Sequence, residues 1–252
     1  METKIGDFFI KYNSVYNITD EDYKNVNILI NTAKAFARNI NQSVCVIDYF
    51  RQDFLYVSEN MPYLCGQIVE TINDLDNRFY IDCITENERN IIIEINKKGF
   101  EFFYELPSME RVSYTLSFDF HIKNGRTSRL VSRSLTPIAL TKDGKIWLAL
   151  CIISISPRST PGNVIMRKFD SGSYFELSHE RTNWIKKHST KLTDIERDII
   201  ILSSQGYTMD EIADKLYRSI NTIKACKRSL FAKMNVKNIT EALSFAIKYK
   251  LL

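Results

Sequence analysis

The sequence has few of the residues that build metal or redox centres. Its five cysteines are odd in number and widely scattered, and no CxxC spacing occurs among them. Its three histidines have no partners at the spacing of metal ligands. These absences exclude a disulfide-rich secreted domain and a zinc module, and they favour a reducing cytosol as the setting.

Long apolar runs are also absent. The longest, from Ile146 to Ile153, is far too short to span a bilayer. The first residues include the acids Glu2 and Asp7 and no long apolar core, which argues against a signal peptide. We therefore expect a cytoplasmic protein with no membrane partner.

The motifs of common enzymes are missing as well. The chain contains no nucleophile elbow, P-loop, zinc spacing or paired carboxylate motif, so we expect no enzymatic activity. What it does have is material for ordinary cores, because 44% of its 252 residues are hydrophobic, with 15 Phe and 13 Tyr. That length accommodates a small module and a second domain of ordinary size.

Acidic residues are missing from one particular stretch. None occurs between Asp214 and Glu241, although the whole chain is nearly balanced, with 34 Lys and Arg against 30 Asp and Glu. Such a local excess of basic charge favours a polyanion partner, because each neutralised phosphate releases counterions. The basic residues of this stretch are Lys215, Arg218, Lys224, Lys227, Arg228, Lys233 and Lys237.

Capping chemistry predicts four helices around this basic stretch. Thr193, Thr208 and Asn238 each precede a glutamate by three residues, the spacing of a capping box, and Ser219 is a preferred N-cap residue. Gly206 lies where a left-handed C-cap ends the first helix. Only two residues separate the second helix from Ser219, a connection short enough for a helix-turn-helix.

These residues resemble the LuxR/FixJ/GerE-type DNA-binding domain. The resemblance covers about a quarter of the chain, and it implies four helices, of which the third enters the major groove of double-stranded DNA. Asn235 stands where the family commonly has Gly, and Cys226 where many members have His. The matching motifs are Leu192-Thr193-x-x-Glu196, Gly206, Glu211-Ile212-Ala213, Leu216, Ser219, Thr222-Ile223-Lys224, Lys233-Met234 and Glu241-Ala242.

The resemblance also implies roles for single residues. Some positions of the third helix face the groove in the family, and others touch or approach phosphate. One residue at a helix start presents N–H groups to the DNA backbone. The groove-facing positions correspond to Lys224, Ala225 and Arg228, the phosphate positions to Asn221, Thr222 and Lys227, and the helix start to Thr208.

Phe245 and Tyr249 lie one turn apart in the last predicted helix. A separate stripe that includes Ala246 and Ile247 is expected to face the core, so the two aromatic side chains point elsewhere. In the resembled family this helix forms the dimer contact on DNA. Two interpretations stay open: the aromatic pair forms a homodimer contact, or it covers the rest of its own chain.

Towards the N-terminus the chain changes from helical to strand periodicity. An amphipathic helix from Thr19 to Ile40 precedes two strands and several short helices. Residues 85–88 form a further capping-box sequence, which opens a longer helix. Three strands then follow, separated by the hairpin signals Asn124-Gly125 and Asp143-Gly144.

This order resembles a PAS domain, most clearly from Phe54 to Gly66. The resemblance implies a five-stranded antiparallel sheet with helices over one face, and a role in sensing a small molecule, holding a cofactor or dimerising. We expect neither flavin nor haem, because the reactive-Cys motif and a helical His ligand are both lacking, and we expect no metal. An apolar pocket for an unknown ligand is predicted to be lined by Val44, Val46, Phe118, Phe120 and Ile152, although core filling is the favoured role for each of these residues taken singly.

The sequence therefore predicts an α+β protein. A helical extension (1–41) precedes a PAS-like sensor or dimerisation domain (42–157), a linker (158–190) with a small hairpin at residues 164–177, and an all-α four-helix domain (191–252). We expect a transcriptional regulator that binds DNA sequence-specifically as a homodimer, with its PAS-like half reading a signal or setting the oligomeric state. The alternative is that this half is a ligand-free interaction and dimerisation platform.

Overall fold

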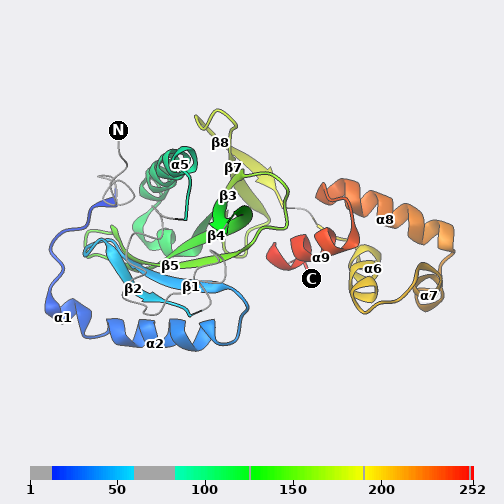
Figure 1. Ribbon diagram of the computed structural model, residues 1–252, viewed down its shortest axis with the longest axis horizontal. Coiled ribbons are helices and arrows are strands. Elements are labelled where there is room, and N and C mark those ends of the chain that lie inside the picture. The colour runs from blue at the N-terminus through cyan, green and yellow to red at the C-terminus, as the bar shows by residue number, and fades with distance from the viewer. Residues whose placement is uncertain (1–12, 60–82, 125, 190, 250) are drawn as a thin grey trace. The chain divides into compact units, whose positions relative to one another are not determined.

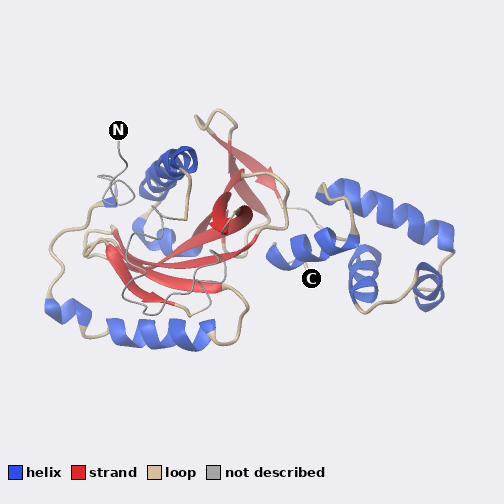
Figure 2. Ribbon diagram, in the orientation of Figure 1, coloured by secondary structure: helices blue, strands red, loops and turns tan. Residues whose placement is uncertain are grey.

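The computed structural model describes residues 13–59, 83–124, 126–189, 191–249 and 251–252. The chain divides into two compact units, Met1–Lys187 and His188–Leu252. Figures 1 and 2 show strands in the first unit and only helices in the second. The short helices predicted after the second strand, the first of them at residues 59–66, lie almost wholly outside the described residues. No helix in the described part of the chain combines the length and apolarity needed to cross a membrane.

Among the described residues, the first unit is built on one eight-stranded sheet, in which every pair with an assigned register is antiparallel. The strand order is β2-β1-β5-β4-β3-β6-β7-β8. The predicted three-stranded meander is present as β3, β4 and β5, with the first hairpin ladder running to the pair Asn124 and Thr127. The strands are β1 (Ser43–Asp48), β2 (Asp53–Val57), β3 (Tyr114–Asn124), β4 (Thr127–Leu140), β5 (Ile146–Ile155), β6 (Gly162–Lys168), β7 (Ser173–Leu177) and β8 (Trp184–His188).

This sheet has eight strands and not the five predicted, because the segment interpreted as a linker adds three. The expected hairpin is β6 and β7, and β6 also pairs with β3. The added strands pack on helix α5 (Glu86–Glu105) through aromatic side chains. The ring of Phe102 lies 5.1 Å from that of Phe175 and 5.2 Å from that of Trp184, centroid to centroid. Burial of these rings makes the segment part of the core.

Helices lie on both faces of the sheet (Figure 1). On one face, α2 (Val26–Ala37) covers Val44 and Val46 through Ala33. On the other face, α5 covers the main core, which includes Ile92, Phe100 and Phe103 and the inward side chains of β1, β3, β4 and β5. A 3-10 helix, η4 (Ser108–Ser113), then leads into β3.

The N-terminal amphipathic helix is broken into two. α1 (Asp20–Tyr23) ends before α2 begins at Val26. Asp48, at the end of β1, is fully buried and accepts a hydrogen bond from the Tyr23 hydroxyl. The Tyr23 ring stands perpendicular to that of Trp147, with centroids 5.2 Å apart. These contacts attach α1 to the sheet.

The capping box predicted at Thr85 does not form. Thr85 is the N-cap residue of α5, but its side chain accepts no capping hydrogen bond. The Glu88 carboxylate instead accepts from His121, both from the backbone N–H and, at 2.7 Å, from Nδ1. A contact with β3 that is distant in sequence has therefore replaced the local one.

The second unit consists of α6 (Asp194–Ser204), α7 (Met209–Lys215), α8 (Ile220–Met234) and α9 (Ile239–Lys248). Isolated helices as short as these are marginally stable in water, so they depend on packing against one another. Apolar side chains from all four helices meet in one core. The fully buried members are Ile199, Ile200, Ile212, Ala213, Ile223, Leu230, Met234, Ala242 and Ala246.

Candidate nucleic-acid interface

The predicted caps place the helices of the second unit. The hydroxyls of Thr193 and Thr208 each accept the predicted N–H, and the paired glutamates reach back, so both capping boxes are confirmed. Ser219 Oγ accepts from the Thr222 N–H at 3.1 Å. At Asn238 the box is shifted by one residue, because the glutamate accepts the N–H of Lys237 and not that of Asn238.

The turn between α7 and α8 is closed by a left-handed residue. Tyr217 has φ +52° and is 93% exposed. The Arg218 N–H donates to the Ala213 carbonyl at 2.9 Å, and the Tyr217 N–H donates to the Asp214 carbonyl at 3.1 Å, which is the Schellman pattern. This turn releases the chain from α7 and leads directly into the Ser219 N-cap, so α7 and α8 form a helix-turn-helix.

Helix α8 has one buried side and one exposed side. Ile223, Leu230 and Met234 face the core. Lys224, Ala225 and Arg228, the predicted groove-facing residues, are all exposed, as is Asn221. Their spacing of three and four residues places these four on one stripe of the helix. This stripe, residues 221, 224, 225 and 228, is called the α8 face below.

Thr222 and Lys227 flank the α8 face but are engaged within the protein. The Thr222 hydroxyl lies 2.8 Å from Ser219 Oγ. Lys227 is half-buried, and its Nζ lies 3.9 Å from the sulfur of Met209 and 5.7 Å from the ring centroid of Phe231. Its stem therefore packs between α7 and α8 while its charge stays at the start of α7.

Thr208 is occupied by its own capping box. Its hydroxyl donates to Glu211 Oε2 at 2.8 Å, and its N–H donates to the same oxygen at 2.8 Å. These two hydrogen bonds hold the pKa of Glu211 below its ordinary value, so a negative charge stands at this helix start. The structure therefore places Thr208 at the start of α7, with its side chain turned to a carboxylate.

One basic residue of the acid-free stretch has a structural role. Lys233 Nζ lies 2.6 Å from Glu196 Oε2 and donates to the Lys191 carbonyl at 3.2 Å. Burial raises the pKa of Glu196, but hydrogen bonds from Lys233 and Thr193 outweigh it and leave the pKa below its ordinary value. Lys233 thus neutralises a buried carboxylate, a role that charge counting along the sequence missed.

The predicted dimer residues pack partly against their own unit. Phe245 and Tyr249 are half-buried, with ring centroids 4.3 Å apart, and Phe245 touches the core cluster. Ile247, which was expected to face the core, is 61% exposed. That expectation was wrong because the core of α9 is narrow, with Ala242 and Ala246 as its fully buried residues.

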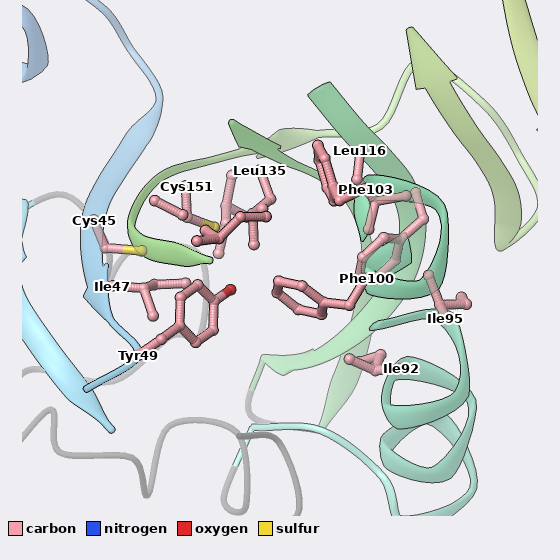
Figure 3. Packing of buried hydrophobic residues seen from close by; sticks show 14 of the residues in the cluster. Cys45, Ile47, Tyr49, Ile92, Ile95, Phe100, Phe103, Leu116, Leu135 and Cys151 are labelled. Carbon is pink, nitrogen blue, oxygen red and sulfur yellow. The ribbon is translucent and has the colours of Figure 1, made fainter. Parts of the chain in front are cut away.

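The five residues of the predicted pocket do not share one face of the sheet. Phe118 and Phe120 belong to the core under α5, whereas Val44 and Val46 lie under α2. Ile152 is the ladder partner of Val44 and faces the same way. Successive side chains alternate across a sheet, so choosing even positions on β1 selected the wrong face. The α5 side carries Cys45 and Ile47 of β1 and Tyr49, which directly follows this strand (Figure 3).

The core under α5 also holds an arginine that the apolar prediction missed. Arg133 on β4 is 3% exposed. Its guanidinium lies 5.6 Å from the ring centroid of Phe118 and donates to Asn96 Oδ1 of α5 at 3.4 Å. Strand alternation contained the signal, because Arg133 shares its parity with the core residues Val131 and Leu135.

Comparison with known sequences places the second unit in a family. Residues 190–246 match the profile of the bacterial regulatory proteins of the luxR family. Over 61 residues the chain is 39% identical to the oxygen regulatory protein NreC of Staphylococcus carnosus (strain TM300), which is 24% of this chain and 28% of that protein. NreC of Staphylococcus aureus (strain USA300) matches at 38% identity over the same length. The match spans only just over a quarter of these relatives.

Solved structures of VqmA are similar along most of the chain, at low identity. A phage VqmA–DPO complex has 16% identity and a TM-score of 0.33, with 90% of this chain and 92% of that chain covered. VqmA of Vibrio cholerae has 13% identity and a TM-score of 0.33, with 86% of each chain covered. The residues that match the family profile form the helices α6, α7 and α8 and most of α9. The C-terminal part of this chain is therefore a luxR-type helix-turn-helix domain.

Proposed function

We propose that this protein is a transcriptional regulator that binds double-stranded DNA sequence-specifically as a homodimer. The single observation that carries this proposal is the α8 face. Lys224 and Arg228 stand exposed on one stripe, opposite the buried stripe that fixes the helix in its unit. Arg and Lys on such a helix reach guanine edges in the major groove.

The small side chain of Ala225 supports close approach to DNA. It lies exposed between the two basic residues, where a larger side chain would hold the helix away from the bases. We assign Asn221, at the start of the face, to a phosphate contact. We assign the flanking phosphate contacts to Thr222 and Lys227, and we assign to Thr208 the role of the helix-start residue, with the N–H groups that follow it in the first turn of α7 directed to the DNA backbone.

We further propose that the first unit controls where two such domains stand on DNA. Its sheet contains two early strands and a three-stranded meander, with α5 over one face, and this arrangement supports the PAS-like interpretation. A signal would act by shifting the population of dimer geometries that match the half-site spacing. A ligand-free dimerisation platform is the competing role for this unit, and the many fully buried side chains beneath α5 favour it.

A selection of genomic DNA fragments with the purified full-length protein, at moderate salt, tests the DNA-binding proposal. An enriched inverted or direct repeat would support it and would give the half-site spacing. Binding that falls steeply with salt and enriches no sequence would contradict specific recognition. Thermal unfolding of the full chain, with a metabolite panel, separates the two roles of the first unit, because a ligand that binds only the folded unit raises its Tm.

A further inference from the structure

Two cysteine side chains lie side by side on neighbouring strands, on the same face of the sheet of the first unit. Cys45 on β1 and Cys151 on β5 are direct partners in an antiparallel ladder. Both are essentially fully buried, and Figure 3 shows them near Leu135 in the core under α5. Opposed residues in such a ladder have Cα atoms roughly 4.5–5.5 Å apart. A disulfide needs about 4.4–6.8 Å, so the backbone already has the required spacing.

A buried cation is aimed at one of these two thiols. Arg133 Nε donates to Cys151 Sγ at 3.3 Å, from a side chain that is itself 3% exposed. Burying a guanidinium costs free energy unless charge or hydrogen bonds compensate it. A thiolate at Cys151 would compensate it directly, whereas an apolar side chain at the same position would not.

The surroundings shift the pKa values of the two thiols in opposite directions. The thiol–thiol hydrogen bond lowers the pKa of Cys151, and the neighbouring Arg133 lowers it further against the effect of burial. The same hydrogen bond and burial raise the pKa of Cys45. The titratable groups that face Cys151 among the described residues are Cys45, Tyr49 and Arg133. Because the Arg133 guanidinium donates to its sulfur, Cys151 is the thiol of the pair that is better placed to react as a thiolate.

We propose that Cys45 and Cys151 form a reversible disulfide when the protein meets a hydroperoxide. The Cys151 thiolate attacks the peroxide, so that an S–O bond forms, the O–O bond breaks and the leaving oxygen takes up a proton. The Cys45 sulfur then attacks the resulting sulfenic acid. The S–S bond forms, the S–O bond breaks, and water leaves with the Cys45 proton. The two thiols lose two electrons and the peroxide gains them, and a dithiol reductant reverses the reaction.

Oxidation would change the charge beside a contact between the sheet and α5. The disulfide removes the thiolate that faces Arg133, whose guanidinium also donates to Asn96 on α5. The proposal concerns the first unit alone and does not depend on DNA binding. Its readout is the oxidation state of two named sulfurs, so it can fail while the proposed function stands.

The test exposes the full-length native protein to hydrogen peroxide, blocks free thiols with N-ethylmaleimide under denaturing conditions, and maps the digest by mass spectrometry. We expect a peptide pair joined through Cys45 and Cys151, which dithiothreitol separates. The variants Cys45→Ala and Cys151→Ala should each abolish the linked pair, and the matched control Cys226→Ala should retain it. The wild-type result is decisive even if a core variant fails to fold.

Rates provide the second measurement. Linkage in the wild type should slow as the pH falls and the Cys151 thiolate is protonated. Arg133→Met removes the cation that lowers the pKa of Cys151. At a pH below this pKa, the rate of linkage should fall about tenfold for each unit by which the pKa rises. Two free, alkylated thiols after native oxidation would overturn the proposal, provided that the unfolded protein reacts. A linkage to Cys65 or Cys83, or oxidation of Cys151 that stops at the sulfinic acid, would overturn it equally.

Discussion

The ammonium nitrogen of Lys233 on α8 lies 2.6 Å from the Glu196 carboxylate on α6, and 37 positions separate the two residues. The Glu196 side chain is 7% exposed and that of Lys233 33%. The same carboxylate accepts the Thr193 N–H of its own capping box at 2.8 Å. One buried carboxylate thus holds the start of α6 to the end of the candidate recognition helix.

Removing the ammonium should loosen the second unit. Lys233→Met leaves a buried carboxylate with the Thr193 contacts alone, and we expect a loss of about 1–2 kcal/mol of stability, moderated by the partial exposure of Lys233. Hydrogen exchange of the α6 and α8 amides in the full chain measures it. Lys237→Met, at an exposed position, is the matched control. Equal protection in the two variants would show that the pair does not stabilise the unit.

The same carboxylate predicts a pH dependence. Because the pKa of Glu196 is lowered in the folded chain, its contribution to stability is present above the unfolded value of about 4.3 and is lost as the pH falls through the folded value. We expect the stability difference between wild type and Glu196→Gln to shrink as the pH falls from about 5 to 3. Comparing the two cancels the other titrating carboxylates. A constant difference would contradict the assigned charge.

Base contacts of the α8 face should appear in DNA affinity. Arg228→Ala and Lys224→Ala are each expected to weaken binding to a selected operator by about 1–3 kcal/mol and to relax its sequence preference. Fluorescence anisotropy at fixed salt measures the change. Lys142→Ala removes the same charge from an exposed turn of the first unit and should leave affinity unchanged. If either α8 variant matches this control, that residue does not read bases.

The attachment of α1 to the sheet predicts a stability change in the first unit. Tyr23→Phe removes the hydroxyl that donates to the fully buried Asp48, and we expect a loss of about 1–2 kcal/mol. Tryptophan fluorescence should follow it, because Trp147 contacts the Tyr23 ring. Tyr16→Phe, at a residue that is 70% exposed, is the control and should be neutral. An equally small change at Tyr23 would argue against this attachment.

The two interpretations of α9 separate cleanly in a pair of variants. Phe245→Ala removes a ring that packs on the core, so we expect a loss of stability of about 2 kcal/mol. Ile247→Glu changes an exposed residue and should leave the Tm unchanged. If α9 forms the dimer contact on DNA, this variant lowers dimer occupancy in a gel-shift titration. Unaltered stoichiometry would place dimerisation in the first unit.

The helix-turn-helix was predictable because its signals are local. Thr193, Thr208 and Ser219 cap their helices as their sequences indicate, and Gly206 adopts the predicted left-handed conformation at φ +88°. A capping hydrogen bond joins atoms three residues apart, so no distant part of the chain has to be known. The α8 face follows from helical spacing in the same way.

The remainder depended on contacts between distant residues. Glu88 accepts a hydrogen bond from His121 and does not form the capping box predicted with Thr85. The segment after Pro157 forms strands of the sheet, and Phe175 and Trp184 of these strands pack against Phe102 of α5. The residues predicted to line one pocket lie on two faces of the sheet, because the face that each strand turns toward α5 depends on packing between distant segments.

The sequence alone therefore determined where the helices of the DNA-binding unit start, which side of α8 is buried, and that the first unit contains a meander. Only the tertiary structure decided which face of β1 lies under α5, that Cys45 lies opposite Cys151 on the neighbouring strand, and that Lys233 pairs with Glu196. Period-two alternation states that side chains alternate but not which parity faces which helix, because that choice depends on how strands and helices far apart in sequence pack together.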